Sequence, residues 1–364
     1  MSFALCVMSL VFALLVLCQP CANLCYAEIT QNRLPDLASD GAHDKTPLEV
    51  QIADTSAQSA IVVERSSGRV LYAKNPDIRL PNASTTKIAT ALTVLRHVPD
   101  LDKVVTVCAE ACGVEGSSVY LQAGEKLTVR DLLYGLLLRS GNDCAVQLAY
   151  TVGGDVQKFV ELMNDVVRSL GCNNTNFVTP HGLHDERHFT TARDLAKITR
   201  AALANADFAQ IVSSKSYRVT TDGSTRVFVN KNKLLANFDG ADGVKTGFTK
   251  KAGRCFVGSA TRNGMGVVAV VLDCAPMFED AAKLLNKAFD EFTLQTVVTK
   301  NRICGATTLP SGKRVVYVCP EKFAYPLRAD ENCRVEFLLD DRAVTEVYVN
   351  DNLVAELPLR AVPS

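Results

Sequence analysis

Apolar and polar positions follow two different periods along this chain. Runs with apolar residues at successive or alternate positions, which are typical of strands, occupy 59–74 and most of 216–272. Between them, apolar residues recur every three or four positions, which is typical of helices. Strands on both sides of a helical block predict an α/β (α+β) fold. We expect helices to pack on an antiparallel sheet, with the central block as a helical insertion.

Short local patterns mark where several elements begin and end. Arg65-Ser66-Ser67-Gly68 separates two apolar runs and predicts a β-hairpin, and Asn263-Gly264 predicts a tight turn between later strands. Thr128 and Thr191 are each followed three residues later by Asp, which indicates capped helix starts. The predicted strands are 59–64, 69–74, 216–220, 225–229, 243–249, 254–260 and 266–272, and two predicted helices are 156–170 and 281–292.

The two ends of the chain differ from this central region. Residues 1–27 contain no Asp, Glu, Lys or Arg and are largely apolar, which predicts a signal peptide for export rather than a buried apolar helix. Residues 28–57 are polar and predict a linker or N-terminal arm. A larger domain then covers 58–292, and short β-like runs predict a small all-β, sandwich-like domain over 293–364. No later apolar run approaches 18 residues, so no C-terminal membrane anchor is expected.

Composition restricts the partners and the role of the cysteines. With 39 Lys and Arg against 39 Asp and Glu, the chain has no net charge, which favours no nucleic-acid partner. Four of the 13 cysteines fall within 1–27, and an odd number remains. Cys108 and Cys112 lack the second pair or the histidine that a zinc site needs. Free, buried cysteine is favoured over a disulfide framework or a metal site.

Three short segments carry candidate chemistry. In Ser84-Thr85-Thr86-Lys87, a helix beginning at Ser84 would place Lys87 one turn later on the same face. A serine hydroxyl becomes a good nucleophile when a base takes its proton, and lysine can be that base if burial keeps it neutral. Alone, this segment is more simply a capped helix with a surface lysine.

The other two segments add groups that could bind a peptide. Ser140-Gly141-Asn142 offers a hydroxyl that could relay a proton and an amide that could hold a substrate amide. Lys245-Thr246-Gly247, followed by Phe248, offers a charge and a hydroxyl to a carboxylate, and its glycine lets a ligand approach the strand. Each segment alone could equally be a helix end or an exposed edge strand.

In this order the three segments match the motif set of penicillin-binding proteins and serine β-lactamases. The chain resembles the low-molecular-mass penicillin-binding proteins, the serine-type D-alanyl-D-alanine carboxypeptidase family, because Gly141 stands where class A β-lactamases carry Asp. The resemblance covers about 59–292. Further stretches that share it are 180–183, 230–235 and 242–249.

The resemblance implies an exported enzyme that removes the terminal D-Ala from peptidoglycan pentapeptide stems, without a cofactor or metal. It implies that Ser84 is acylated, Lys87 is its base and Ser140 relays a proton. Asn142, Lys245, Thr246 and Gly247 would bind the substrate, and the N–H groups of Ser84 and Phe248 would form the oxyanion hole. β-Lactams would be covalent inhibitors.

Some alternatives and departures remain at this stage. A β-lactamase or transpeptidase would use the same acylation, and a non-catalytic peptidoglycan-binding protein would use only the binding groups. Some relatives place an Arg after the strand ending near Leu272 to hold the substrate carboxylate, whereas this chain has none in 273–278. His181, His184 and His188 lie in one loop, and we expect a structural role or solvent exposure for them rather than metal binding.

Overall fold

The computed structural model describes residues 51–221, 224–308, 312–339 and 342–363. The predicted signal peptide and residues 28–50 of the predicted arm therefore lie outside the described residues. Gln51–Ile52, at the end of that arm, forms a short strand, β1, and Ala53 and Ala57 are buried. The sheet and its core thus begin before residue 58, because a parallel pairing with β3 holds this segment.

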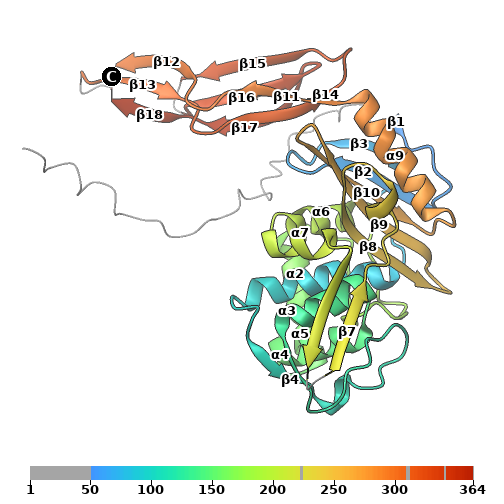
Figure 1. Ribbon diagram of the computed structural model, residues 1–364. Coiled ribbons are helices and arrows are strands. Elements are labelled where there is room, and N and C mark those ends of the chain that lie inside the picture. The colour runs from blue at the N-terminus through green and yellow to red at the C-terminus, as the bar shows by residue number, and fades with distance from the viewer. Residues whose placement is uncertain (1–50, 222–223, 309–311, 340–341, 364) are drawn as a thin grey trace, which may run out of the picture. The chain divides into compact units, whose positions relative to one another are not determined.

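The central sheet has the strand order β1-β3-β2-β10-β9-β8 (Figure 1). Its neighbouring strands are antiparallel except for the pair β1 and β3. The predicted hairpin and the turn at Asn263-Gly264 are confirmed, and both turn residues have positive φ, 49° and 79°. Besides β1, the strands are β2 (Ser59–Glu64), β3 (Val70–Lys74), β8 (Ala241–Thr249), β9 (Gly253–Arg262) and β10 (Met265–Leu272).

The helical insertion lies between β3 and β8, as predicted. The side chains of Thr128 and Thr191 accept hydrogen bonds from the N–H groups of Asp131 and Asp194, so both predicted helix caps are confirmed. The insertion contains η1 (Ala83–Thr86), α2 (Lys87–His97), η2 (Ala109–Ala111), α3 (Val129–Tyr134), the π-helical turn η3 (Gly135–Arg139), α4 (Asn142–Gly153), α5 (Val156–Ser169), α6 (Ala192–Leu203), α7 (Ala206–Ser213) and α8 (Leu234–Asn237).

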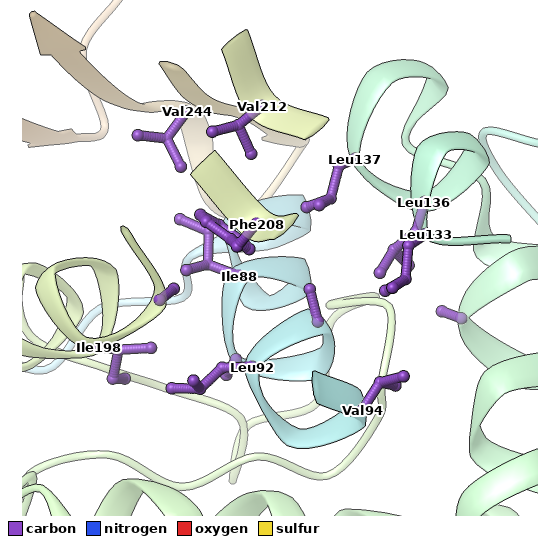
Figure 2. Close-up of a cluster of buried hydrophobic side chains, with 14 of the residues drawn as sticks. Ile88, Leu92, Val94, Leu133, Leu136, Leu137, Ile198, Phe208, Val212 and Val244 are labelled. Carbon is purple, nitrogen blue, oxygen red and sulfur yellow. The ribbon is translucent and has the colours of Figure 1, made fainter. Parts of the chain in front are cut away.

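The two faces of the sheet contribute to two separate hydrophobic cores. Along β2, Ile61 belongs to the core on the side of the insertion, whereas Val62 belongs to the core under α9 (Met277–Glu291). This alternation follows from the period of two in a strand. Figure 2 shows Ile88 and Leu92 of α2 surrounded by side chains from α6, α7 and η3. The first turn of α2, which carries the candidate lysine, is therefore deeply packed.

Two predicted strands pair differently from our expectation. β6 (Ser216–Thr221) and β7 (Ser224–Val229) form a separate two-stranded sheet and do not join the central one. Both have mainly exposed or half-exposed positions, so neither has the apolar face that a place in the central sheet needs. A further pair, β4 (Val104–Thr106) and β5 (Lys126–Thr128), lies within the insertion.

The region after α9 is all-β, as predicted. Its strands form small sheets around two minor cores, which include Val298, Val347 and Val349. Over the described residues, no helix is long and apolar enough to cross a membrane. The strands are β11 (Thr293–Val298), β12 (Ile303–Thr308), β13 (Arg314–Val318), β14 (Phe323–Leu327), β15 (Cys333–Leu338), β16 (Val344–Val349), β17 (Asn352–Pro358) and β18 (Arg360–Pro363).

The packing of α5 on the insertion core provides a test of this architecture. Phe159 is completely buried, so Phe159→Ala should lower the free energy of unfolding by about 3–5 kcal/mol. Val227 is 52% exposed, and Val227→Ala should change the free energy of unfolding by less than about 1 kcal/mol. Urea unfolding followed by circular dichroism measures both variants. Equal shifts for both variants would contradict the assignment of α5 to the core.

Candidate active site

Ser84 lies in a tight turn that precedes α2. It is half-buried, whereas its neighbours Thr85 and Thr86 are completely buried. The turn is entered through Ala83, whose φ is +46°. Gly182 covers it closely, because a Cβ built on Gly182 would lie 2.0 Å from the Ala83 carbonyl oxygen. The Ser84 side chain is thus accessible on a turn that its surroundings hold in one conformation.

Lys87 is the first residue of α2 and is completely buried. Its Nζ lies 2.9 Å from Ser84 Oγ and 2.7 Å from both Asn142 Oδ1 and the His181 carbonyl oxygen. Burial lowers the pKa of Lys87 well below its usual value, and the positive charge of Lys245 lowers this pKa further. The alternative interpretation of this segment, a capped helix with a surface lysine, is therefore wrong.

Ser140 and Asn142 lie where the π-helical turn η3 meets α4. Ser140 has left-handed backbone angles, φ 64° and ψ 34°, and is 4% exposed. Asn142 begins α4, and its Nδ2 donates to the Glu115 carbonyl oxygen at 2.5 Å while its Oδ1 accepts from Lys87. Within the described residues, the Ser140 hydroxyl has no hydrogen bond to Ser84, Lys87 or Lys245. The structure thus joins Asn142 directly to Lys87, and Ser140 precedes Asn142 by two residues at the end of η3.

Lys245, Thr246 and Gly247 lie on β8, the edge strand of the central sheet. The Lys245 side chain is 2% exposed, and its Nζ donates to the Thr246 carbonyl oxygen at 2.9 Å. Burial, together with the charge of Lys231, lowers the pKa of Lys245 to about 7. A Cβ on Gly247 would lie 3.1 Å from Ser84 N, so this part of β8 packs directly against the turn that carries Ser84.

Phe248 follows on the same strand and presents its side chain outward. It is 62% exposed, and the guanidinium of Arg254 lies 5.7 Å from its ring centroid. An edge strand leaves alternate backbone groups unpaired, so β8 can pair with an extended peptide that lies beside it. The segments around Ser84, Asn142 and Lys245 therefore converge, and Phe248 extends the same strand beyond them.

Two buried polar residues support these segments: His188, for which the sequence predicted no particular partner, and Asp143, which sequence reasoning missed. His188 Nδ1 accepts the N–H of Val178, so its Nε2 carries the proton and donates to Thr86 Oγ1 at 2.8 Å. Asp143 accepts the N–H groups of Val119 and Leu121 and thereby holds the loop beside Asn142. The contacts of His188 with Thr86 and of Asp143 with Val119 and Leu121 have no sequence pattern, because the partners are 22 to 102 residues apart.

The loop histidines have partners other than a metal. The His181 carbonyl accepts from Lys87, and burial lowers the pKa of its ring to about 3. His188 is used by Thr86, and its pKa is lowered to about 4 by burial. In the part of the chain that the structure describes, no group of three or more His, Cys, Asp or Glu residues could hold a metal ion.

Comparison with known proteins identifies the family. The Peptidase_S11 family, described as D-alanyl-D-alanine carboxypeptidase, matches residues 45–275. A curated relative, D-alanyl-D-alanine carboxypeptidase DacF of Bacillus subtilis, is 33% identical over 71% of this chain and 68% of its own length.

Two solved structures extend the comparison. The DD-transpeptidase of Streptomyces K15 is 35% identical, with a TM-score of 0.63, over 66% of this chain and 100% of its own. D-alanyl-D-alanine carboxypeptidase DacD of Francisella tularensis shares the fold, with a TM-score of 0.70 at 24% identity over 89% of this chain and 97% of its own. The chain therefore belongs to the Peptidase_S11 family of serine-type D-alanyl-D-alanine carboxypeptidases, the low-molecular-mass penicillin-binding proteins.

Proposed function

We propose that this protein removes the terminal D-Ala from peptidoglycan stem peptides through an acyl-enzyme on Ser84, with Lys87 as the base. The observation that carries this proposal is the surroundings of the Lys87 amine. A neutral amine has two N–H donors and one lone pair. Two carbonyl oxygens, of Asn142 and His181, can take both donors, and this leaves the lone pair for the hydroxyl of Ser84 at 2.9 Å.

The electrostatics of the site favour the same assignment. A buried lysine beside a second buried lysine loses its proton at a lower pH than an exposed one, because burial and like charge both disfavour the ammonium. Lys87 meets both conditions, since Lys245 is its largest charged influence after burial itself. Lys87 can therefore accept the Ser84 proton at neutral pH.

The substrate would lie as an extended peptide along β8. Its backbone amide would meet Asn142, and its terminal carboxylate would meet Lys245 and Thr246. The absence of a side chain at Gly247 keeps the strand close to the Ser84 turn, so the scissile carbonyl can reach Ser84 Oγ. The N–H groups of Ser84 and Phe248 would then stabilise the oxyanion.

The reaction has two steps. Lys87 takes the Ser84 proton while Ser84 Oγ bonds to the carbonyl carbon of the penultimate D-Ala. The C–N bond then breaks, and Ser140 relays the proton from Lys87 to the nitrogen of the terminal D-Ala, which leaves as the free amine while Lys87 becomes neutral again. Water next attacks the ester, Lys87 takes one of its protons, and cleavage of the ester returns a proton to Ser84. No metal or cofactor enters this balance.

The location of the substrate requires the enzyme to act outside the cytoplasm. Peptidoglycan stems are extracytoplasmic, and the sequence of residues 1–27 is that of an export signal. We therefore propose that the protein is exported to the cell envelope or secreted, where β-lactams would also reach it as covalent inhibitors.

Transpeptidation is the second candidate function. It would use the same acyl-enzyme but transfer it to an amine, and similarity to the Streptomyces K15 DD-transpeptidase supports it. A β-lactamase would need fast hydrolysis of the drug adduct, and the sequence contains no recognisable Glu-based element of the class A kind for that step. A non-catalytic binder would have no use for a buried lysine aimed at a serine.

The decisive experiment measures products and adducts together. With a D-Ala-D-Ala-terminated peptide, mass spectrometry should detect free D-Ala and the shortened peptide, and with penicillin it should detect one stable adduct on Ser84. Ser84→Ala should lose both, whereas Ser117→Ala, which alters a nearby hydroxyl, should retain the adduct. Products joined to an added amine would favour transpeptidation, and rapid drug turnover would favour a β-lactamase. The absence of both the cleavage product and the penicillin adduct would leave a non-catalytic binder as the remaining interpretation.

The role of Lys87 can be tested by a substitution that makes its positive charge permanent. Lys87→Arg should reduce the rate of penicillin acylation by at least about a hundredfold, because a guanidinium cannot be deprotonated in a protein. Lys158 is exposed on α5, and Lys158→Arg should leave the rate unchanged. Acylation rates come from intact mass over time, with circular dichroism to confirm folding. A fully active Lys87→Arg variant would show that another group is the base.

His188 predicts how stability depends on pH. Its pKa is lowered to about 4 in the folded protein, so the unfolded chain binds the proton more tightly. The neutral, buried His188 therefore stabilises the folded protein fully above about pH 6.5, and this stabilisation is lost as the pH falls toward 4. By pH 5 the loss in the free energy of unfolding is roughly 2 kcal/mol. Urea unfolding at pH 7.5 and pH 5 measures how much free energy of unfolding each protein loses. His188→Gln should lose less than the parent, and His184→Gln, at an exposed position, should lose as much as the parent. An equal loss in all three proteins would contradict a buried neutral His188.

A further inference from the structure

Two cysteine side chains in the C-terminal all-β region lie close enough to react with each other. The Sγ atoms of Cys304 and Cys319 are 3.2 Å apart. Within the described residues, no other two cysteine side chains are in hydrogen-bond contact, although Cys333 lies in the same hydrophobic cluster. We propose that Cys304 and Cys319 form a disulfide bond when the protein meets a low-molecular-mass disulfide as oxidant.

The backbone holds both cysteines in place. β12 and β13 are antiparallel, and the register shifts between Ile303 and Gly305, so Cys304 is the extra residue of a bulge. Cys319 donates its N–H to the Arg302 carbonyl at 3.0 Å and accepts the N–H of Asn301 at 2.8 Å. A disulfide needs the sulfurs to approach by about 1.2 Å more, and side-chain rotation can supply this while the strands stay paired.

The surroundings of the two sulfurs favour oxidation over metal binding. Within the part of the chain that the structure describes, the Cys319 side chain has two side-chain polar contacts, with Cys304 and with the hydroxyl of Thr345 at 3.6 Å. This set lacks the three or four nitrogen, oxygen or thiolate ligands that a metal site requires. The adjacent core is also small, with Val298, Cys319 and Val347 as its fully buried members. A covalent link is one of the ways in which a small core gains stability.

The different exposure of the two cysteines sets the order of the reaction. Cys304 is half-exposed and Cys319 is 2% exposed, so the external disulfide reaches Cys304 first. The Cys304 thiolate attacks oxidised glutathione, which forms a mixed disulfide and releases one glutathione thiolate. Cys319 then attacks the Cys304 sulfur and releases the second glutathione. Two protein thiols lose two electrons and two protons, and one glutathione disulfide becomes two thiols.

The rate should depend on pH because the thiolate is the reactive form. Burial and the contact with Cys319 raise the pKa of Cys304 to about 11. The thiolate fraction, and with it the rate of the first step, should therefore rise about tenfold for each pH unit between 7 and 9. This dependence separates attack by Cys304 from reaction at a cysteine of low pKa.

The test uses the full chain, reduced and then incubated with oxidised glutathione, blocked with iodoacetamide and digested with trypsin without reduction. The expected product is peptide 303–313 linked to peptide 315–322, with a mass two hydrogen atoms below their sum. Cys304→Ser and Cys319→Ser should each abolish it. Cys333→Ser, the matched control in the same region, should retain it, and the oxidised parent should resist thermal unfolding better than Cys304→Ser.

Two results would overturn the proposal. One is linkage of Cys333 to either cysteine in place of this pair, and the other is complete alkylation of both Cys304 and Cys319 after the oxidant. Neither depends on the catalytic chemistry, because the linked peptides lie outside the family match at 45–275. Formation of the penicillin adduct on Ser84, measured on the same sample, reports separately on the proposed function.

Discussion

The burial of Lys87 is the constraint on which the rest of the site depends. An ammonium group moved into the interior is strongly destabilising, so the protein must either neutralise it or surround it with acceptors. Here the acceptors come from different parts of the helical insertion, namely Asn142 at the start of α4 and the carbonyl of His181 in the loop before α6. These elements must therefore pack around the first turn of α2 for the site to exist.

The sheet supplies the second half of this arrangement. Its two faces are covered by separate cores, so β8 is held as an edge strand whose position relative to the helical insertion is set by packing on both sides. Gly247 then allows the strand to lie against the turn that carries Ser84. A Cβ at this position would lie 3.1 Å from Ser84 N, so a larger residue would require the strand or the turn to move by a few tenths of an ångström.

A group of buried polar contacts holds η1, the turn that carries Ser84, in place. Thr86 receives a hydrogen bond from His188 and donates one to the carbonyl of Ala83, the residue with positive φ before Ser84. Asp143 plays a similar part for the loop beside Asn142. Buried polar networks are stabilising only when their members are satisfied, so they allow few alternative arrangements. Their effect here is to hold Ser84 and Asn142 in a single geometry around Lys87.

The sequence by itself determined the elements with strong local patterns. The capped helix starts at Thr128 and Thr191 and the Asn263-Gly264 turn depend on neighbouring residues, so the chain encodes them directly. The motif residues could be named because three short segments in this order resemble a known motif set, whereas the spacing of Ser84 and Lys87 alone fits a capped helix equally well. Tertiary structure alone decided which contacts these residues make. The separate pairing of β6 and β7, the contact of His188 with Thr86 and the low pKa of Lys87 all depend on packing between distant segments. Local periodicity does not predict such contacts, because burial and the distance between charges are properties of the folded chain.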